Sequence, residues 1–284
     1  SSNARALETE LAGRVASLHG VGEAVLGQLS GQRLIDLALN AVELIDRNLY
    51  ERSCDVRWWA TDSAVVGAAD APGDQGRASF AASRLGVILD AYTVYLDLWL
   101  ADAQGRVIAN GRPQRYPGVR GLSVAGETWF RDALATGSAD DYVVADVAGC
   151  AALGGAPVAT YAAAIRTGAA KRGRPIGVLG IHFDWGPQAR AIVEGVRLSP
   201  EERSRTRVML LDRNHRVIAA SGGHGLLQER FALRTEGRSS GLYRQPDGTT
   251  VAFHLRNIFS KTGVQRQAEL VALILSVPLA QPVT

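Results

Sequence analysis

The sequence predicts a mixed α/β protein of the α+β class, in which a long N-terminal helix precedes two tandem antiparallel-sheet modules. Apolar residues recur at three-and-four spacing from Arg5 to about Val66, and no proline interrupts them. Short runs of alternating polarity, typical of strands, dominate after residue 92. One strand, turn, strand unit occurs twice. We expect a helical region at 1–70, a first module at 71–192 and a second at 193–284.

The helical region carries five glycines in its first half, each of which costs about 1 kcal/mol relative to alanine. We therefore expect the helix to bend or break near Gly31. A turn at Ala71–Asp74 follows, and a second helix is expected from Ala78 to about Ala91.

Strands begin at Thr93–Leu100, whose alternation divides the side chains between two faces. The turn that follows opens the repeat, because Asp102–Ala109 and Asp212–Ala219 are identical at five of eight positions. Two further strands are expected in each half, at 158–166 and 176–183 and again at 250–257 and 269–277. Short helices at 188–196 and after Ser199-Pro200 mark the boundary. The expected faces are Val94, Leu96, Leu98 and Leu100 on one side and Tyr95, Asp97 and Trp99 on the other.

Composition excludes several classes of protein. The formal net charge is only +3 and no basic run is present, so nucleic-acid binding is not expected. No run approaches the roughly 18 apolar residues of a membrane span, and no signal peptide opens the chain. The chain starts without Met, so we expect a piece of a longer protein. Cys54 and Cys150 allow one disulfide, but we favour two unpaired thiols.

Enzyme motifs are absent from the sequence. There is no Gly-x-Ser-x-Gly, no phosphate-binding glycine loop and no His-Glu-x-x-His, and the five histidines lack metal-ligand spacing. We expect no catalytic residue, no metal and no cofactor. A catalytic group assembled only by the fold stays open as an alternative.

Four segments, taken in their order and spacing, carry a family resemblance: 98–111, 126–134, 141–146 and 176–183. The chain resembles the double Cache sensor domain of bacterial chemoreceptors, histidine kinases and diguanylate cyclases over essentially its whole length. The resemblance implies two PAS-like modules, the first of them distal to the membrane and binding a small molecule. It also implies a periplasmic location, a tether to the inner membrane by spans outside this sequence, and a homodimer in the receptor.

The resemblance places Trp129, Phe130 and Asp146 at or near the pocket. Members of the family that bind free amino acids carry an Arg two residues before the Trp, a Tyr-x-Asp pair and an Asp on the last strand of the module. Here these positions are Glu127, Val144-Ala145-Asp146 and His182. A Glu repels the carboxylate that an Arg would bind, so we expect a cationic, amine-bearing or neutral heterocyclic ligand instead of an α-amino acid.

His182 is expected either to titrate near neutral pH in the pocket or to be a hydrogen-bonded strand residue. The other candidate ligand contacts are Asp97, Trp99, Arg115, Tyr116, Tyr142 and Tyr161. Each has packing or a solvated surface as its alternative, as do Trp129 and Phe130. The adjacent Trp58 and Trp59 cannot share one helix face, so one should face the module and the other a second subunit or the loop after Ala71. We interpret both as packing residues.

The sequence thus predicts a ligand-binding sensor module that is not an enzyme. Two alternatives remain: an interaction domain that docks a periplasmic binding protein, and an uncharacterised enzyme.

Overall fold

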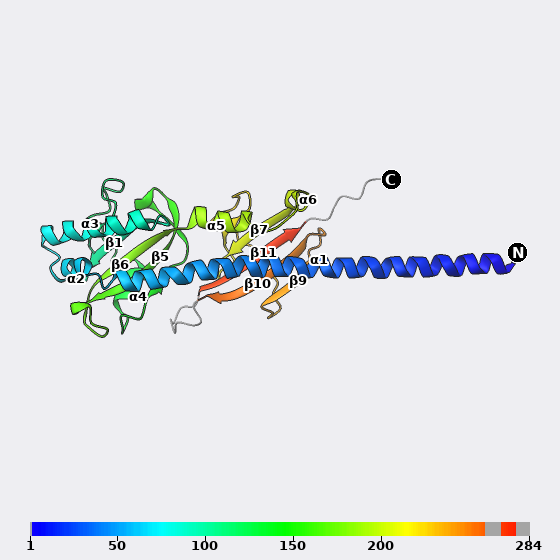
Figure 1. Ribbon diagram of the computed structural model, residues 1–284, viewed down its shortest axis with the longest axis horizontal. Helices are drawn as coiled ribbons and strands as arrows, with labels where there is room; N and C mark the ends of the chain where they lie inside the picture. The colour runs from blue at the N-terminus through cyan, green and yellow to red at the C-terminus, as the bar shows by residue number, and fades with distance from the viewer. Residues whose placement is uncertain (1, 259–267, 277–284) are drawn as a thin grey trace.

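The computed structural model describes residues 2–258 and 268–276. Helix α1 (Ser2–Trp59) runs alongside two separate sheets, and its N-terminal end projects beyond both (Figure 1). The expected break near Gly31 does not occur. A Cβ at Gly31 would lie 2.6 Å from Cδ2 of Leu242 in β9 (Ser240–Arg244), so the glycine lets α1 approach the second sheet closely.

The first sheet has the strand order β2-β1-β6-β5-β3, with β4 also paired to β5. Helices α2 and α3 and the C-terminal part of α1 pack on one side of it, and α4 packs on β5 and β6. The bounds of its elements are α2 (Ser63–Asp70), α3 (Gln75–Ala91), β1 (Tyr95–Asp102), β2 (Val107–Asn110), α4 (Thr128–Leu134), β3 (Val143–Val144), β4 (Ala148–Cys150), η1 (Ala151–Leu153), β5 (Ala156–Arg166), η2 (Thr167–Ala169) and β6 (Pro175–Asp184).

The second sheet has the order β8-β7-β11-β10-β9, which repeats the connectivity of the first. Helix α5 joins the sheets, and α6 begins with a capping box in which Ser199 and Glu202 bond each other's backbone N–H groups. The bounds are α5 (Trp185–Glu194), α6 (Pro200–Ser204), β7 (Thr206–Leu211), β8 (Val217–Ala220), β10 (Thr250–Ile258) and β11 (Ala268–Ser276). The expected strand end at Val277 lies outside the described residues.

The sequence repeat is confirmed at the level of strand register. Leu100 pairs with Ala109 in the first sheet and Leu210 with Ala219 in the second, and a β-bulge follows at the same position in each. The carboxylate that opens each turn, Asp102 or Asp212, accepts two backbone N–H groups of its own turn. The two hairpins therefore occupy equivalent places in two sheets.

The expected alternation along β1 is wrong at its start. A register shift between Tyr95 and Asp97 moves the side chains of one strand end to the opposite faces. Tyr95 packs with Leu98 and Leu100 against the helices, whereas Leu96 packs with Trp99 on the other face. The alternating polarity of the strand sequence does not indicate where a bulge occurs. Only the pairing of β1 with β6 reveals it.

One apolar core extends from α1, α2 and α3 through both sheets, because Trp185 and α5 connect the two modules inside it. Trp59 is buried and meets Tyr92 and Tyr95 edge to face, as expected for the residue that faces the module. Trp58 is 71% exposed, so the loop after Ala71 does not cover it. Both cysteines are free, as favoured from the sequence.

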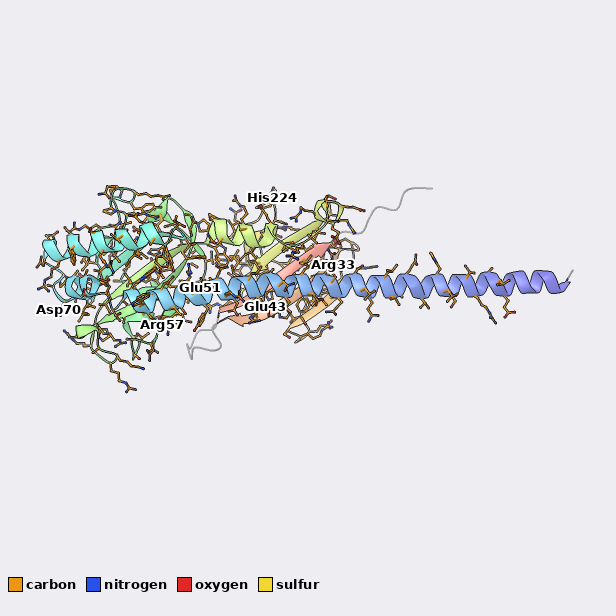
Figure 2. All side chains as sticks on the ribbon, in the orientation of Figure 1. Arg33, Glu43, Glu51, Arg57, Asp70 and His224 are labelled. Carbon is orange, nitrogen blue, oxygen red and sulfur yellow. The ribbon has the colours of Figure 1, made fainter. Side chains whose placement is uncertain are left out.

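Ion pairs attach α1 to the second sheet. Arg256 of β10 pairs with Asp46 at 2.8 Å and with Glu43 at 3.3 Å, and Arg33 pairs with Glu202 of the segment after α5 (Figure 2). The part of α1 that precedes Gly31 and these pairs stands clear of the described body (Figure 2). None of the described helices combines the length and the apolar character needed to cross a lipid bilayer.

Candidate functional site

The candidate site lies on the face of the first sheet that α4 covers, opposite α1. Strands β1, β5 and β6 each present side chains there, and α4 with the connection before it lies over them. Most of the face is apolar and buried, but Thr160 and His182 stand directly opposite each other on β5 and β6. The apolar members are Leu96, Trp99, Val119, Val124, Trp129, Phe130, Ala133, Leu153, Val158 and Ala162, with Tyr116 packed at the edge.

His182 lies at the centre of an aromatic group. Its ring centroid is 4.0 Å from that of Trp99 and 6.0 Å from that of Trp129. Its Nδ1 lies 3.0 Å from the hydroxyl oxygen of Thr160. We call these four residues the His182 cluster. The imidazole Nε2 is buried and has no hydrogen-bond partner among the described residues, which leaves one polar position open to a ligand group.

The His182 side chain stays neutral in the folded protein. Burial lowers the pKa of His182 to about 3, because the imidazolium ion would lose its hydration and no carboxylate compensates it. The expectation that His182 titrates near neutral pH in the folded state is therefore wrong. The alternative of a hydrogen-bonded strand histidine describes Nδ1, but it leaves Nε2 unexplained.

Asp97 is fully buried and its carboxylate is saturated. It accepts hydrogen bonds from the backbone N–H groups of Leu98 and Arg112, from Trp99 Nε1 at 3.1 Å and from Asn110 Nδ2 at 2.8 Å. Burial raises the pKa of Asp97, and these hydrogen bonds oppose the rise. The carboxylate therefore fixes the bulged start of β1 and orients Trp99, and in this conformation it offers no free oxygen to a ligand.

Trp129 and Phe130 face the sheet from α4, both nearly fully buried. The indole of Trp129 lies flat enough on β6 that a Cβ at Gly180 would be 3.0 Å from its Cζ3. Glycine at that position therefore makes room for the ring. Glu127 precedes α4 as its N-cap, is exposed and makes no side-chain cap bond; its charge contributes to a raised pKa of Cys150, whose largest cause is burial. This exposed carboxylate lies two residues before Trp129 in the chain.

Arg115 and Tyr116 lie beside the apolar cluster of the site. The Arg115 guanidinium lies over the Tyr116 ring at 5.2 Å from its centroid, and Tyr116 packs on the apolar part of the site. Burial raises the pKa of Asp184, and the charge of Arg115 opposes that rise, so the arginine is near the end of β6. Arg115 and Tyr116 are both among the candidate ligand contacts named from the sequence.

Three expected contacts lie elsewhere. Tyr142 and Tyr161 belong to the core on the α1 side of the sheet, with Arg57 of α1 over the Tyr142 ring. Asp146 is exposed on the loop between β3 and β4 and pairs with Arg213 of the second module at 2.8 Å. Tyr142, Tyr161 and Asp146 are therefore not gathered with Trp129.

Thr160 and Gly180 belong to the site, but they were not predicted from the sequence. In 158–165 Thr160 is the only hydroxyl on its face of β5, and polarity on an otherwise apolar strand face was the available signal. Its use depends on the pairing of β5 with β6, which no local pattern reveals.

The corresponding face of the second sheet carries a buried apolar cluster of Met209, Leu211, Val217, Ala220, Val251, Phe253, Val271 and Leu273. Among the described residues, no buried polar side-chain atom without a hydrogen-bond partner belongs to this cluster, in contrast to Nε2 of His182 on the first sheet. Across the described residues no three His, Cys, Asp or Glu side chains are placed to hold a metal ion.

Two cavities open elsewhere on the surface. One of about 630 Å³ lies between α1 and α5, beside Leu44 and Ile192, and one of about 570 Å³ lies at the α3 end of the first module, beside Arg106 and Arg120. Neither includes a residue of the His182 cluster.

Comparison with known proteins gives a match only at the level of structure. No protein-family description and no curated protein matches the sequence. The sensor domain of the V. cholerae histidine kinase DctB superposes with a TM-score of 0.65 at 13% identity, covering 91% of this chain and 99% of that one.

Two chemoreceptor domains superpose nearly as well. The ligand-binding domain of Pseudomonas fluorescens CtaA in complex with L-serine has a TM-score of 0.61 at 14% identity, over 88% of this chain and 98% of that one. That of the Pseudomonas aeruginosa PAO1 amino acid chemoreceptor PctC, in complex with GABA, has a TM-score of 0.61 at 17% identity, over 87% and 100%. These structures are sensor and ligand-binding domains, and the present chain has their double Cache fold.

Proposed function

We propose that this chain is the extracytoplasmic sensing domain of a bacterial membrane receptor, with a small-molecule site at the His182 cluster. The observation that carries the proposal is the buried, unpartnered Nε2 of His182 between Trp99 and Trp129. Aromatic walls around one or two polar groups are typical of small-molecule sites. The shared fold supports a sensor instead of an enzyme.

The ligand class follows from the charges around this site. His182 is neutral, Asp97 is saturated by donors, and Glu127 is exposed at the start of α4, where its side chain makes no cap hydrogen bond. A ligand N–H can donate to Nε2 while Nδ1–H donates to Thr160. We infer a cationic, amine-bearing or neutral heterocyclic ligand, in contrast to the amino acids bound by the CtaA and PctC domains.

Three ligands that share one imidazole ring test this inference: histamine, 4-methylimidazole and imidazole-4-acetate. We expect affinity to fall in that order, measured by calorimetry and by thermal shift, where a ligand at a hundred times its Kd adds about 2.7 kcal/mol of stability. Glu127→Arg should reverse the order of the amine and the acid. Because Glu127 is exposed, the change for each should be only about fivefold.

Glu127→Gln is the matched control, since it removes the charge without adding one, and should leave the two charged ligands nearly equal. The inference is wrong if imidazole-4-acetate binds the unmodified protein most tightly. It is also wrong if Glu127→Arg leaves the order of the three ligands unchanged.

We also propose that two copies associate through the projecting part of α1. Apolar residues there are widely exposed and follow steps of four and three residues, interrupted once at Gly22. This is the heptad spacing of a two-stranded coiled coil. The stripe consists of Leu11 (56% exposed), Val15 (63%), Leu18 (71%), Val25 (49%) and Leu29 (63%).

A charge placed in this stripe should dissociate the dimer. We expect Leu18→Glu to raise the dimer Kd by at least about tenfold, because two buried carboxylates would face each other across the seam. Sedimentation equilibrium measures the effect. Ser17→Glu adds the same charge at an exposed position of α1 that points away from the seam, and should not change the Kd. A monomeric unmodified protein, or equal effects of both substitutions, would count against the seam.

A further inference from the structure

We propose that the turn Asp212–Arg216, between β7 and β8, is the coupling contact through which a change at the His182 cluster reaches the second sheet. The turn is on the second module, yet its two arginines bind the first. This inference rests on the proposed ligand site and assigns the route by which its occupancy alters the rest of the domain.

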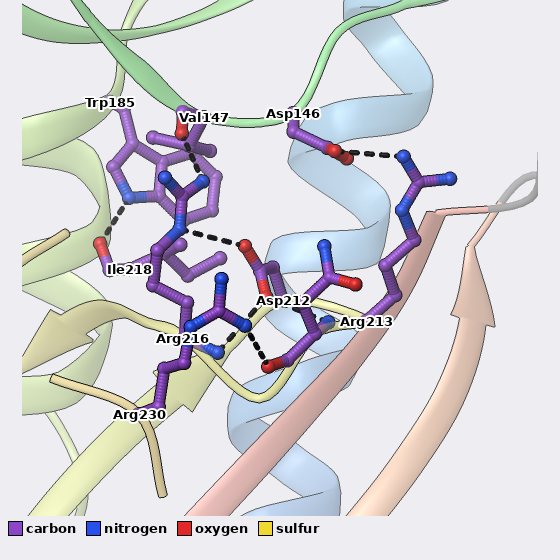
Figure 3. A network of polar contacts seen from close by, with 9 residues as sticks. Asp146, Val147, Trp185, Asp212, Arg213, Arg216, Ile218 and Arg230 are labelled. Carbon is purple, nitrogen blue, oxygen red and sulfur yellow. Dashed lines mark hydrogen bonds and ion pairs between the residues drawn. The ribbon is translucent and has the colours of Figure 1, made fainter. Parts of the chain in front are cut away.

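Two side chains of the turn hold one short loop of the first module (Figure 3). Arg213 Nη2 donates to Asp146 Oδ2 at 2.8 Å, and Arg216 Nη2 donates to the carbonyl oxygen of Val147 at 2.7 Å. Arg216 is itself fixed, since its Nε donates to Asp212 Oδ2 at 3.0 Å. The Arg216 guanidinium is thus bonded to Val147 through Nη2 and to Asp212 through Nε. A displacement of the Val147 carbonyl is therefore transmitted to the backbone of the turn.

The loop that the arginines hold is joined directly to the candidate site. The backbone N–H of Ala145 donates to the carbonyl of Thr160 at 2.8 Å, and the Thr160 hydroxyl contacts His182 Nδ1. Asp146 and Val147 follow Ala145 in the chain. A ligand that moves His182 and Thr160 therefore moves the two acceptors of the turn.

A second attachment joins the same hairpin to the strand that carries His182. Trp185 lies three residues after His182 in the chain and is buried. Its Nε1 donates a hydrogen bond to the carbonyl oxygen of Ile218 in β8 at 2.5 Å (Figure 3). Both partners of the Thr160–His182 pair are thus connected to one hairpin, β5 through the loop and β6 through Trp185. A shift between β5 and β6 would rotate this hairpin.

The internal repeat provides a reference for the turn. Arg106 occupies the position of Arg216 in the first module and is exposed, and Ala103 occupies the position of Arg213. The first copy thus keeps the turn and its aspartate, whereas the second copy uses the same turn to contact another module. Holding the turn together therefore does not by itself require Arg213.

The route is tested by hydrogen exchange of the whole chain without ligand. Thr160→Val removes the hydroxyl contact with His182 and should raise the exchange rate of the Ala145 amide about fivefold, as expected for loss of one hydrogen bond. The amides of β8, Val217–Ala220, should accelerate with it. In an Arg213→Met and Arg216→Met background, Thr160→Val should still accelerate Ala145 but accelerate β8 markedly less, because only the Trp185 attachment to β8 then remains.

Arg106→Met is the matched control, because it removes the equivalent arginine from the first module and should preserve the response of β8. Equal acceleration of β8 with and without Arg213 and Arg216 would overturn the proposal, since the change would then travel through α1 or α5. Acceleration of Ala145 without any response of β8, or no acceleration of Ala145, would also overturn it.

If Thr160→Val does not fold, Trp129→Phe perturbs the same cluster. No ligand enters this measurement, so its failure leaves the binding of the imidazole ligands untouched, and failure to bind them leaves the exchange result standing.

Discussion

Replacing Asp97 with alanine is expected to lower the free energy of unfolding by about 3 to 5 kcal/mol, one of the two largest effects we predict. The carboxylate is fully buried and accepts four hydrogen bonds, two from backbone N–H groups and two from Trp99 and Asn110. Alanine leaves all four donors buried without an acceptor, and each such group costs about 1 to 3 kcal/mol before the site relaxes. Urea unfolding followed by far-UV circular dichroism measures the loss.

Asp90 provides the control, since it is an exposed aspartate near the end of α3. Asp90→Ala should change the free energy of unfolding by less than about 0.5 kcal/mol. If Asp97→Ala proves as mild as Asp90→Ala, then Asp97 does not hold the bulge together, and its place as a saturated structural group is wrong.

Acidification from pH 7 to pH 5 should remove about 2 kcal/mol of stability through His182 alone. The pKa of His182 is lowered to about 3 in the folded state, compared with the ordinary value of 6.5. Between these two values the unfolded chain binds a proton that the folded protein does not. The stabilising contribution is therefore complete above the unfolded pKa and is lost as the pH falls below it, towards the folded pKa.

Chemical unfolding at a series of pH values measures this slope. His182→Gln removes the titrating ring and should flatten the decline between pH 7 and pH 5, whereas His224→Gln, at an exposed histidine, should keep the slope of the unmodified protein. Parallel slopes for the unmodified protein and His182→Gln would show that His182 is protonated in the folded state.

The same burial has a functional consequence. Since His182 stays neutral in the folded protein down to about pH 3, its protonation there does not set the pH dependence of ligand binding between pH 5 and pH 8. The imidazole ring of the three test ligands titrates in this range, so we expect a pH dependence of their binding to come from the ligand. The sequence could not indicate that His182 stays neutral, because the shift depends on the rings of Trp99 and Trp129, which come from elements far apart in the chain.

Local patterns were sufficient for the elements and for their repetition. The identical residues of Asp102–Ala109 and Asp212–Ala219 form turns with the same aspartate bonds, because those bonds lie within four residues of each other. The long helix, the capping box at Ser199 and the opposite exposures of Trp58 and Trp59 are local in the same sense. Gly31 is the exception, since its contact with Leu242 outweighs its low helix propensity.

The assembly of the site was decided by tertiary structure. The sequence by itself determined two tandem α+β modules and placed Trp129, Trp99 and His182 among the candidates. Only the pairing of β1 with β6 and of β5 with β6 joined His182 to Thr160, saturated Asp97, and turned Tyr161 towards α1. The ion pair between Asp146 and Arg213 depends only on the packing of the two modules. The physical reason is that register, bulges and contacts between modules depend on partners distant in the chain, and no spacing along one strand specifies those partners.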